Sequence, residues 1–449
     1  MLFTDFLPAF LVMALFAFKG PRAWLAVTAI AAFFQAATPI VLGVGGRAAG
    51  LAPAYALLPI GVWHGLGLLF RMGRAPRGAR PFAMTGRFGL LALFTAIGVF
   101  GAVAYPRLFQ GLVSVLPPRE GLDSGIVVPL RPSGSNYIQS FYLVCNFTIA
   151  ALVYLFHQQG AITIESFRRF LWIGGTVSVA FGCYQLLAHA TGLPWPASFV
   201  NSNIGVAQLP EQTVLGVRRM SATFLEPSMM SLHFLVLVGA FVFGSGRLLQ
   251  GMPFVFALLV STSSLAYFGL VALVIVWSLL DSWRTGARVV RPLLVTFACC
   301  VLAVTVDQVL FDGEMVERLV FNKFVSGSGL SRITADQLAV DTFVQTWGLG
   351  AGVGSARASS FLATLLATVG LPGTAAFLAL VGSIVSVLAR DRSENAGFVI
   401  YGVLGGVLAW FLSVPDMAMP LVWLFIGFGM QMDVARRPFA ALRTRMAHS

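Results

Sequence analysis

The sequence predicts an all-α, polytopic integral membrane protein, and three features of its composition agree on this class. Hydrophobic residues make up 58% of the 449 residues and charged residues only 10%, whereas soluble domains are roughly 45–50% apolar and about 25% charged. The mean hydropathy is +0.86. Apolar runs of roughly 20 residues, the length that crosses a bilayer, recur along the chain.

The apolar runs predict about 12 or 13 transmembrane helices. The first run, Phe3 to Phe18, lacks the early basic region and the small-residue cleavage site of a signal peptide, so we expect it to be retained as a helix. The expected spans are residues 4–18, 21–43, 51–71, 88–106, 136–157, 170–190, 229–244, 249–261, 264–280, 292–311, 358–388, 394–413 and 418–434.

The positions of the basic residues predict how these spans alternate. If residues 72–87 are cytoplasmic, alternation puts most of the 29 arginine and lysine residues on that side, together with the C-terminus. This topology requires a tight external turn at residues 261–264, between two short helices. The net charge of +12 is then a topology signal, and we expect no nucleic-acid partner.

The predicted topology divides the chain into five parts. These are N-terminal helices at 1–190 with an external loop at 107–135, a second external loop at 191–228, central helices at 229–311, a large external loop at 312–357, and C-terminal helices with a basic tail at 358–449. In the large loop we expect a charged helix from Asp312 to Phe324 and a flexible Gly/Ser stretch at 326–332. Because function resides in loops carried on a rigid scaffold, we expect the site to face the outside.

The stretch RRMSATFLEPS at residues 218–228 carries the first candidate site. It places Arg218, Arg219 and Glu226 at the end of a polar loop, just before an apolar run. One reading is interfacial, with arginine reaching headgroups and glutamate capping the next helix. The other is functional: arginine pairs with an anionic ligand, and the carboxylate acts as a base or orients an acceptor hydroxyl.

The large loop supplies further basic and glycine-rich candidates. Arg332 and Arg357 stand beside small residues, where a phosphate can approach closely, whereas we interpret Arg318 and Lys323 as paired with nearby acids. Glycines at 350, 352 and 354 precede a helix, and such backbone can cradle phosphate oxygens. Glycine runs also let membrane helices pack closely. No strand precedes them, so they are not a dinucleotide fingerprint.

Histidines and cysteines give no sign of a metal site. The five histidines show no clustered spacing, and we interpret His189 and His233, which flank the second loop, as structural. The four cysteines fall inside apolar segments and are expected to be small buried residues. We therefore expect neither a metal nor a cofactor.

The order of the motifs between residues 218 and 373 resembles the O-antigen ligase and polymerase superfamily. The arginine before Glu-Pro-Ser is followed by the serine turn STSSLAYFG (261–269), a long external loop with Ser-Gly and arginine, the G-x-G-x-G-S stretch, and G-x-x-G from Gly370 to Gly373. The resemblance implies a fold related to membrane glycosyltransferases of the GT-C type. It also implies metal-independent transfer of glycans from undecaprenyl diphosphate at the periplasmic face of a bacterial inner membrane.

Two departures from that family decide between its branches. Ligases carry an arginine in the serine turn, where this chain has Ser263 and Ser264, and a His-Asn pair where it has Ser359 and Ser360. The chain therefore looks most like an O-antigen or exopolysaccharide polymerase. A ligase that transfers glycan to lipid A core remains an alternative, as does a flippase or transporter, although transporters place ionisable residues near mid-membrane and these spans are nearly charge-free.

The resemblance also implies roles for the candidate residues. Arg219 matches the arginine before the helix and Arg332 that of the large periplasmic loop, and both would hold the diphosphate. Arg218, Arg357 and the three glycines would assist, and Glu226 is the candidate acceptor-side base. The implied partners are a lipid-linked donor, a lipid-linked acceptor and the bilayer, with a chain-length regulator left open.

Overall fold

The computed structural model describes residues 2–44, 47–74, 83–118, 126–206, 208–209, 211–214, 217–285, 327–412 and 417–432, and the single residues 308, 314 and 317. Within them the protein is predominantly α-helical, and eight helices are long and apolar enough to cross a membrane. Large apolar side chains face outward from them, such as Trp63 (68% exposed) and Phe70 (70% exposed). These features confirm a multi-pass membrane protein.

Most of the long helices match the predicted spans to within a few residues. They are α3 and α4 (Pro53–Ala56 and Leu58–Gly73), α5 (Gly86–Leu108), α6 (Gly134–Gln158), α7 (Ile164–Thr191), α9 with its π-helical end η2 (Pro227–Val238 and Gly239–Gly244), α11 (Ser264–Thr285), α16 with the 3₁₀ turn η4 (Phe361–Val385 and Ser386–Ala389), and α17 (Glu394–Leu412).

The remaining predicted spans are shorter or different in structure. Helices α1 (Leu7–Ala17), α10 (Leu248–Val260) and α18 (Pro420–Gly429) have 11, 13 and 10 residues. The expected span 21–43 is wrong: α2 ends at Ala31, and after a turn the chain continues as strand β2. An apolar run alone does not distinguish a helix from a strand. The expected span 292–311 lies outside the described residues.

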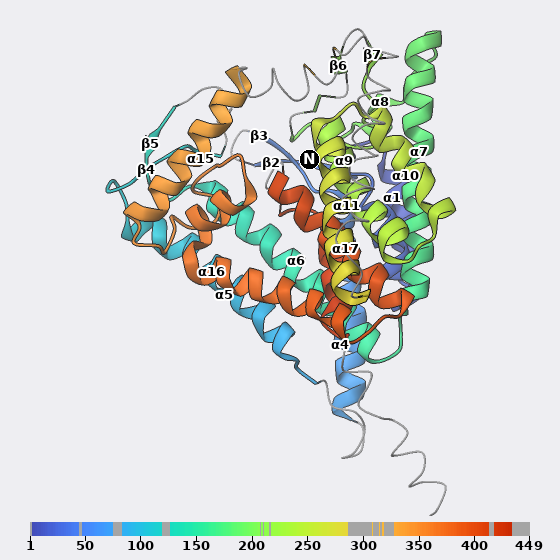
Figure 1. Ribbon diagram of the computed structural model, residues 1–449, viewed down its shortest axis with the longest axis horizontal. Helices are drawn as coiled ribbons and strands as arrows, with labels where there is room; N and C mark the ends of the chain where they lie inside the picture. Colours follow the sequence, from blue (N-terminus) through green and yellow to red (C-terminus); the bar gives the residue numbers. More distant parts are fainter. Residues whose placement is uncertain are drawn as a thin grey trace, which may run out of the picture.

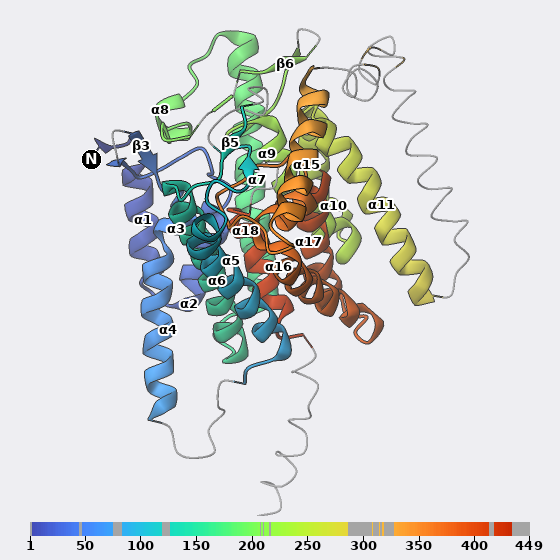
Figure 2. The same ribbon diagram turned by 90° about the vertical axis from the view of Figure 1, so that its left-hand side faces the viewer.

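Short strands and two helices gather at one end of the bundle (Figures 1 and 2). Strands β1 (Leu2–Phe3), β2 (Ile40–Val44) and β3 (Arg47–Gly50) pair antiparallel in that order. Two further antiparallel pairs are β4 (Ser114–Val115) with β5 (Val128–Pro129), and β6 (Thr213–Val214) with β7 (Val217–Arg218). Helices α8 (Ala197–Val200) and α15 (Gly327–Gln345) lie among them.

The Gly/Ser stretch at 326–332 differs from its prediction. From Gly327 onward it forms the first part of α15 rather than a flexible segment. Ser359 N and Ser360 N each donate to Asp336 Oδ1, at 2.7 and 2.8 Å, which ties this helix to the start of α16. Packing against a neighbouring helix therefore overrides the low helix propensity of the glycines. The expected charged helix at 312–324 lies almost entirely outside the described residues.

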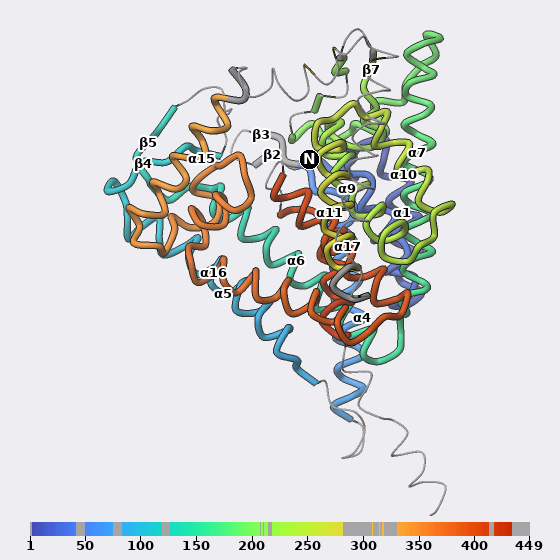
Figure 3. Tube along the Cα trace, in the orientation of Figure 1, coloured from blue at the N-terminus to red at the C-terminus, as the bar shows by residue number. Residues whose placement is uncertain are grey.

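Close backbone contact joins the centre of the bundle. Helix α17 packs along α9 and η2, and a Cβ atom built on Gly405 would lie 2.5 Å from Leu235 O. Gly397 and Gly244 approach each other in the same way, with 2.1 Å from the added atom on Gly397 to Gly244 O. Small residues let membrane helices approach to backbone contact. Helices α5 and α16, distant in sequence, also run side by side (Figure 3).

The opposite end of the bundle collects the loops that were predicted to be cytoplasmic. Arg168 contacts Glu165 at 2.8 Å and Glu394 at 3.0 Å, and Arg247 Nε contacts Glu394 at 2.5 Å. Arg87 donates to Ser383 O at 2.8 Å and also to Met432 O. These contacts join loops from five parts of the chain, so the charge pattern correctly grouped them on one side.

Candidate functional site

Arg219 lies half-buried where the polar loop meets the serine turn. It directly follows β7, and its backbone N–H donates to Gln212 O at 3.0 Å. Its guanidinium donates to Gln212 Oε1 from Nη1 at 2.6 Å and to Ser261 O from Nε at 3.2 Å. The side chain thus connects two segments that the sequence analysis had chosen independently, residues 218–228 and 261–269.

The hydrogen-bond partners of Arg219 among the described residues are neutral. No ion pair to this residue within 4.0 Å is present in the described part of the chain, and its two hydrogen-bond acceptors are neutral. Burial lowers the pKa of Arg219, and the negative charge of Glu226 acts in the opposite direction. Arg219 and Glu226 are therefore neighbours, as the sequence suggested, but they do not neutralise each other through a salt bridge.

Glu226 stands at the N-cap of α9 without capping it. Its backbone is extended, with φ −158° and ψ 163°, and its side chain makes no cap hydrogen bond. Instead Glu226 Oε1 accepts a hydrogen bond from Ser228 Oγ. The Glu226 side chain therefore does not cap α9, although its carboxylate lies at the positive end of the helix dipole.

The neighbouring arginine and the two histidines are arranged differently. Arg218 Nη1 donates to His189 Nδ1 at 3.2 Å on the exposed side of the loop. His233 is 1% exposed, and its Nδ1 is hydrogen-bonded to Met229 O at 2.8 Å within α9. His233 fits the structural role expected for it, whereas His189 is a hydrogen-bond partner of Arg218.

Gln185 of α7, which the sequence analysis did not single out, holds the loop that precedes α9. Its Oε1 accepts from both Ser221 N and Ala222 N at 3.0 Å, and its Nε2 donates to Ser221 Oγ at 2.8 Å. Ala222 has φ 50°, a left-handed conformation that is costly for alanine. A glutamine inside an apolar helix, opposite a polar loop, is the sequence signal that could have identified it.

Replacing Gln185 by methionine is expected to destabilise this loop selectively. The change leaves two buried backbone N–H groups without an acceptor, each at a cost of roughly 1–3 kcal/mol. We expect faster proteolysis within residues 208–226 and a lower midpoint of thermal unfolding in detergent. Thr176→Val on the same helix is the control, because that buried hydroxyl has no partner. Equal proteolysis of Gln185→Met and wild type would contradict this role.

Two further residues with a strained backbone lie in the serine turn and at the start of the glycine-rich loop. Thr262 has φ 45° and Trp347 has φ 53°; with Ala222 these are the three non-glycine residues of positive φ in the described ranges. Ala222 and Thr262 fall in the stretches 218–228 and 261–269 that the sequence analysis singled out, and Trp347 lies three residues before Gly350. Strain of this kind costs about 1–3 kcal/mol per residue and concentrates at functional sites.

The glycine-rich loop is inserted into a break in α16. Gly370 interrupts that helix with φ 65° and ψ −169°, and Leu371 N donates to Gly348 O at 2.8 Å. The N–H groups of Gly350 and Gly352 donate to Thr346 Oγ1 and Thr368 O, both at 3.0 Å. These two amides are thus engaged inside the protein, and the contacts favour the packing role that the sequence left open.

Neighbouring backbone excludes side chains at the three candidate glycines of this loop. A Cβ atom would lie 2.8 Å from Gly370 N at Gly350, 2.5 Å from Gly101 O at Gly352, and 2.5 Å from Ser135 O at Gly354. The loop therefore joins α5, α6 and α16. A phosphate-binding role for these glycines remains a prediction.

The other two candidate arginines lie on the α15 and α16 side of the molecule. Arg357 N donates to Leu116 O at 2.9 Å, and its Nη1 donates to Pro118 O at 3.5 Å. Arg332 is half-buried on α15, which packs against α16 and β4. In Figure 1 α15 lies at the left and β7 with α9 at the right. The structure therefore brings Arg219 and Glu226 together and leaves Arg332 and Arg357 in a second group.

The fold and the site together define a class rather than a family: a polytopic membrane protein with cationic, strained loops at one end of its helix bundle. Comparison with known proteins finds no matching family model and no matching curated sequence.

Proposed function

We propose that this protein is a metal-independent glycosyltransferase of the O-antigen or exopolysaccharide polymerase type. It transfers an undecaprenyl-diphosphate-linked glycan onto a lipid-linked repeat unit, in the inner membrane of a bacterium and at its periplasmic face. The reacting groups bind at the end of the bundle that carries the short strands, and the lipid tails lie between the helices.

The half-buried, unneutralised charge of Arg219 is the observation that carries this proposal. At the opposite end of the bundle the buried Arg168 is surrounded by Glu165 and Glu394. Among the described residues, the Arg219 guanidinium has only an amide oxygen and a carbonyl oxygen as hydrogen-bond partners. A buried cation that lacks a carboxylate partner is costly. That cost is offset when an anionic substrate group binds, and a diphosphate suits the fork geometry of arginine.

The chemistry requires positive charge on the leaving-group side and a base on the acceptor side. The acceptor hydroxyl oxygen forms a bond to the anomeric carbon of the donor glycan, and the bond from that carbon to the diphosphate oxygen breaks. Arg219 stabilises the negative charge that develops on the diphosphate. Glu226 accepts the proton of the acceptor hydroxyl, and Ser228 holds one of its carboxylate oxygens. Arg332, Arg357 and Arg218 contribute to binding charged parts of the two substrates.

An elongation assay tests this function directly. Purified protein in liposomes is given a synthetic undecaprenyl-diphosphate-linked repeat unit in the presence of EDTA. We expect a ladder of longer lipid-linked products, whereas the corresponding monophosphate, a poorer leaving group, should give none. Absence of elongation with the diphosphate donor, or elongation that EDTA abolishes, would contradict the proposal.

A further inference from the structure

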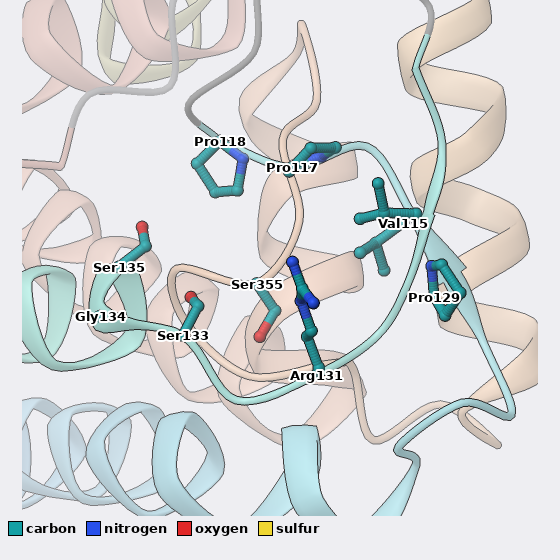
Figure 4. Close-up of a pocket in the computed structure, with 10 residues that line it drawn as sticks. Val115, Pro117, Pro118, Pro129, Arg131, Ser133, Gly134, Ser135 and Ser355 are labelled. Atoms are coloured by element: carbon teal, nitrogen blue, oxygen red, sulfur yellow. The ribbon is translucent and has the colours of Figure 1, made fainter.

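A cavity of ≈ 380 Å³ lies beside the α15 and α16 group (Figure 4), and Arg219 is not among its lining residues. It is lined by the β4 and β5 strands, the start of α6 and the end of the glycine-rich loop. Its lining residues are Val115, Pro117, Pro118, Val128, Pro129, Arg131, Ser133, Gly134, Ser135 and Ser355. One wall is thus apolar and rich in proline, while the other carries a guanidinium and hydroxyl groups.

An arginine in the lining gives this cavity positive charge, and a second arginine lies beside it. Arg131 is exposed, lies between Ser355 and the proline wall in Figure 4, and has no hydrogen bond or ion pair to any described residue. Arg357 donates to the carbonyl oxygen of Pro118, a lining residue, at 3.5 Å. None of the described lining residues is acidic. The cavity therefore favours an anion.

The start of α6 adds backbone donors to the same cavity. The helix is 25 residues long and begins at Gly134; Asn136 N donates to Ser133 O at 3.2 Å, whereas the N–H groups of Gly134 and Ser135 make no hydrogen bond to a described residue. Asn136 holds this end in place: its Nδ2 donates to Val353 O at 2.8 Å and to Ser355 Oγ at 2.7 Å. The positive end of a long helix dipole is thus fixed against the cavity.

Ser135 is the observation that points to a ligand. Ser135 is only 8% exposed as a residue and lines the cavity, and its hydroxyl makes no hydrogen bond to any residue that the structure describes. A hydroxyl that faces a cavity and has no partner among these residues can donate to an acceptor bound there. An acceptor oxygen inside the cavity would supply the missing partner.

We propose that this cavity binds a phosphorylated group, with Arg131 and Ser135 as its principal ligands. Phosphate oxygens accept hydrogen bonds from guanidinium, hydroxyl and backbone amide groups, and Arg131, Ser135 and the start of α6 supply all three kinds of donor. The prolines and valines of the other wall accommodate the apolar part of a phosphate ester. The proposal does not depend on glycosyl transfer, because it concerns binding alone and its principal ligands, Arg131 and Ser135, take no part in the proposed reaction.

Hydrogen exchange with two probes tests this site. The full-length protein in detergent is titrated with inorganic pyrophosphate and, separately, with farnesyl diphosphate. We expect both to protect peptides that span residues 126–140. If farnesyl diphosphate binds about 10-fold or more tightly than pyrophosphate, the ligand is lipid-linked. If the two bind equally, the cavity recognises the phosphate group alone. Peptides at 208–230 report on Arg219 independently, so failure of one site does not imply failure of the other.

Matched variants give the sharper comparison. We expect Arg131→Ala to weaken binding at the 126–140 peptides roughly 10-fold or more, and Ser135→Ala by about 5-fold. Ser135→Ala removes a hydroxyl that bonds to none of the described residues, so the fold should tolerate it. Arg169→Ala removes an equally exposed charge at the opposite end of the bundle and should change nothing. Unchanged affinity in Arg131→Ala, or no protection in wild type at millimolar pyrophosphate, would overturn the proposal.

Discussion

Replacing Arg219 by alanine is expected to lower the rate of elongation roughly 100-fold or more, the effect typical of removing a donor that stabilises developing negative charge. The reason is local: Arg219 is a half-buried cation near Glu226, and no carboxylate in the described ranges lies within ion-pair distance of it. The measurement is the rate of product formation by purified protein at saturating lipid-linked repeat. Arg219→Lys keeps the charge but loses the fork of donors, so it should retain part of the activity.

Two controls separate this electrostatic role from a structural one. Gln212→Ala removes the partner that Arg219 Nη1 contacts at 2.6 Å but leaves the charge in place. Arg218→Ala removes the adjacent charge, which contacts His189 on the exposed side. If Arg219 only joins the loop to the serine turn, Gln212→Ala should be nearly as damaging as Arg219→Ala. Equal elongation by Arg219→Ala and wild type would show that the site is assigned wrongly.

Replacing Gly405 by valine is expected to have the largest effect on stability. The new Cβ atom would lie 2.5 Å from Leu235 O and 3.0 Å from the Cα atom of Val236, so α9 and α17 would have to separate. Overpacking a close-packed interior costs about 1–3 kcal/mol, and more when the obstacle is backbone. We expect a lower midpoint of thermal unfolding in detergent and a reduced yield of folded protein.

Gly382→Val is the matched control for this packing. Gly382 also lies in a long apolar helix, α16, but an added Cβ meets nothing within 4 Å. The control should therefore unfold close to the wild-type temperature. If Gly382→Val and Gly405→Val lowered the unfolding midpoint equally, helix propensity rather than close backbone contact would be responsible.

The long helices could be predicted because length and hydropathy are properties of the segment itself. Spans such as 88–106 and 136–157 correspond closely to α5 and α6. The turn at 261–264 was also predicted, since the charge alternation required it, and the structure has a break there between α10 and α11. The prediction of one helix over residues 21–43 was wrong because the apolar run continues from helix α2 into strand β2.

The candidate site was predictable only in its parts. Charged residues beside an apolar run identified Arg219 and Glu226, and the structure makes them neighbours. The partners of Arg219 and of the strained loop, Gln212 and Gln185, come from segments with no motif of their own. Arg131 was missed because the sequence shows only an arginine beside the start of a helix. The cavity forms because the glycine-rich loop packs against α6.

A structure of the protein with bound undecaprenyl diphosphate, determined by electron cryo-microscopy, tests the central claim most directly. The account predicts diphosphate density within hydrogen-bonding distance of the Arg219 guanidinium, with Glu226 on the side that the acceptor sugar would occupy. Density that lies elsewhere, with Arg219 still bonded only to Gln212 and Ser261, would contradict it.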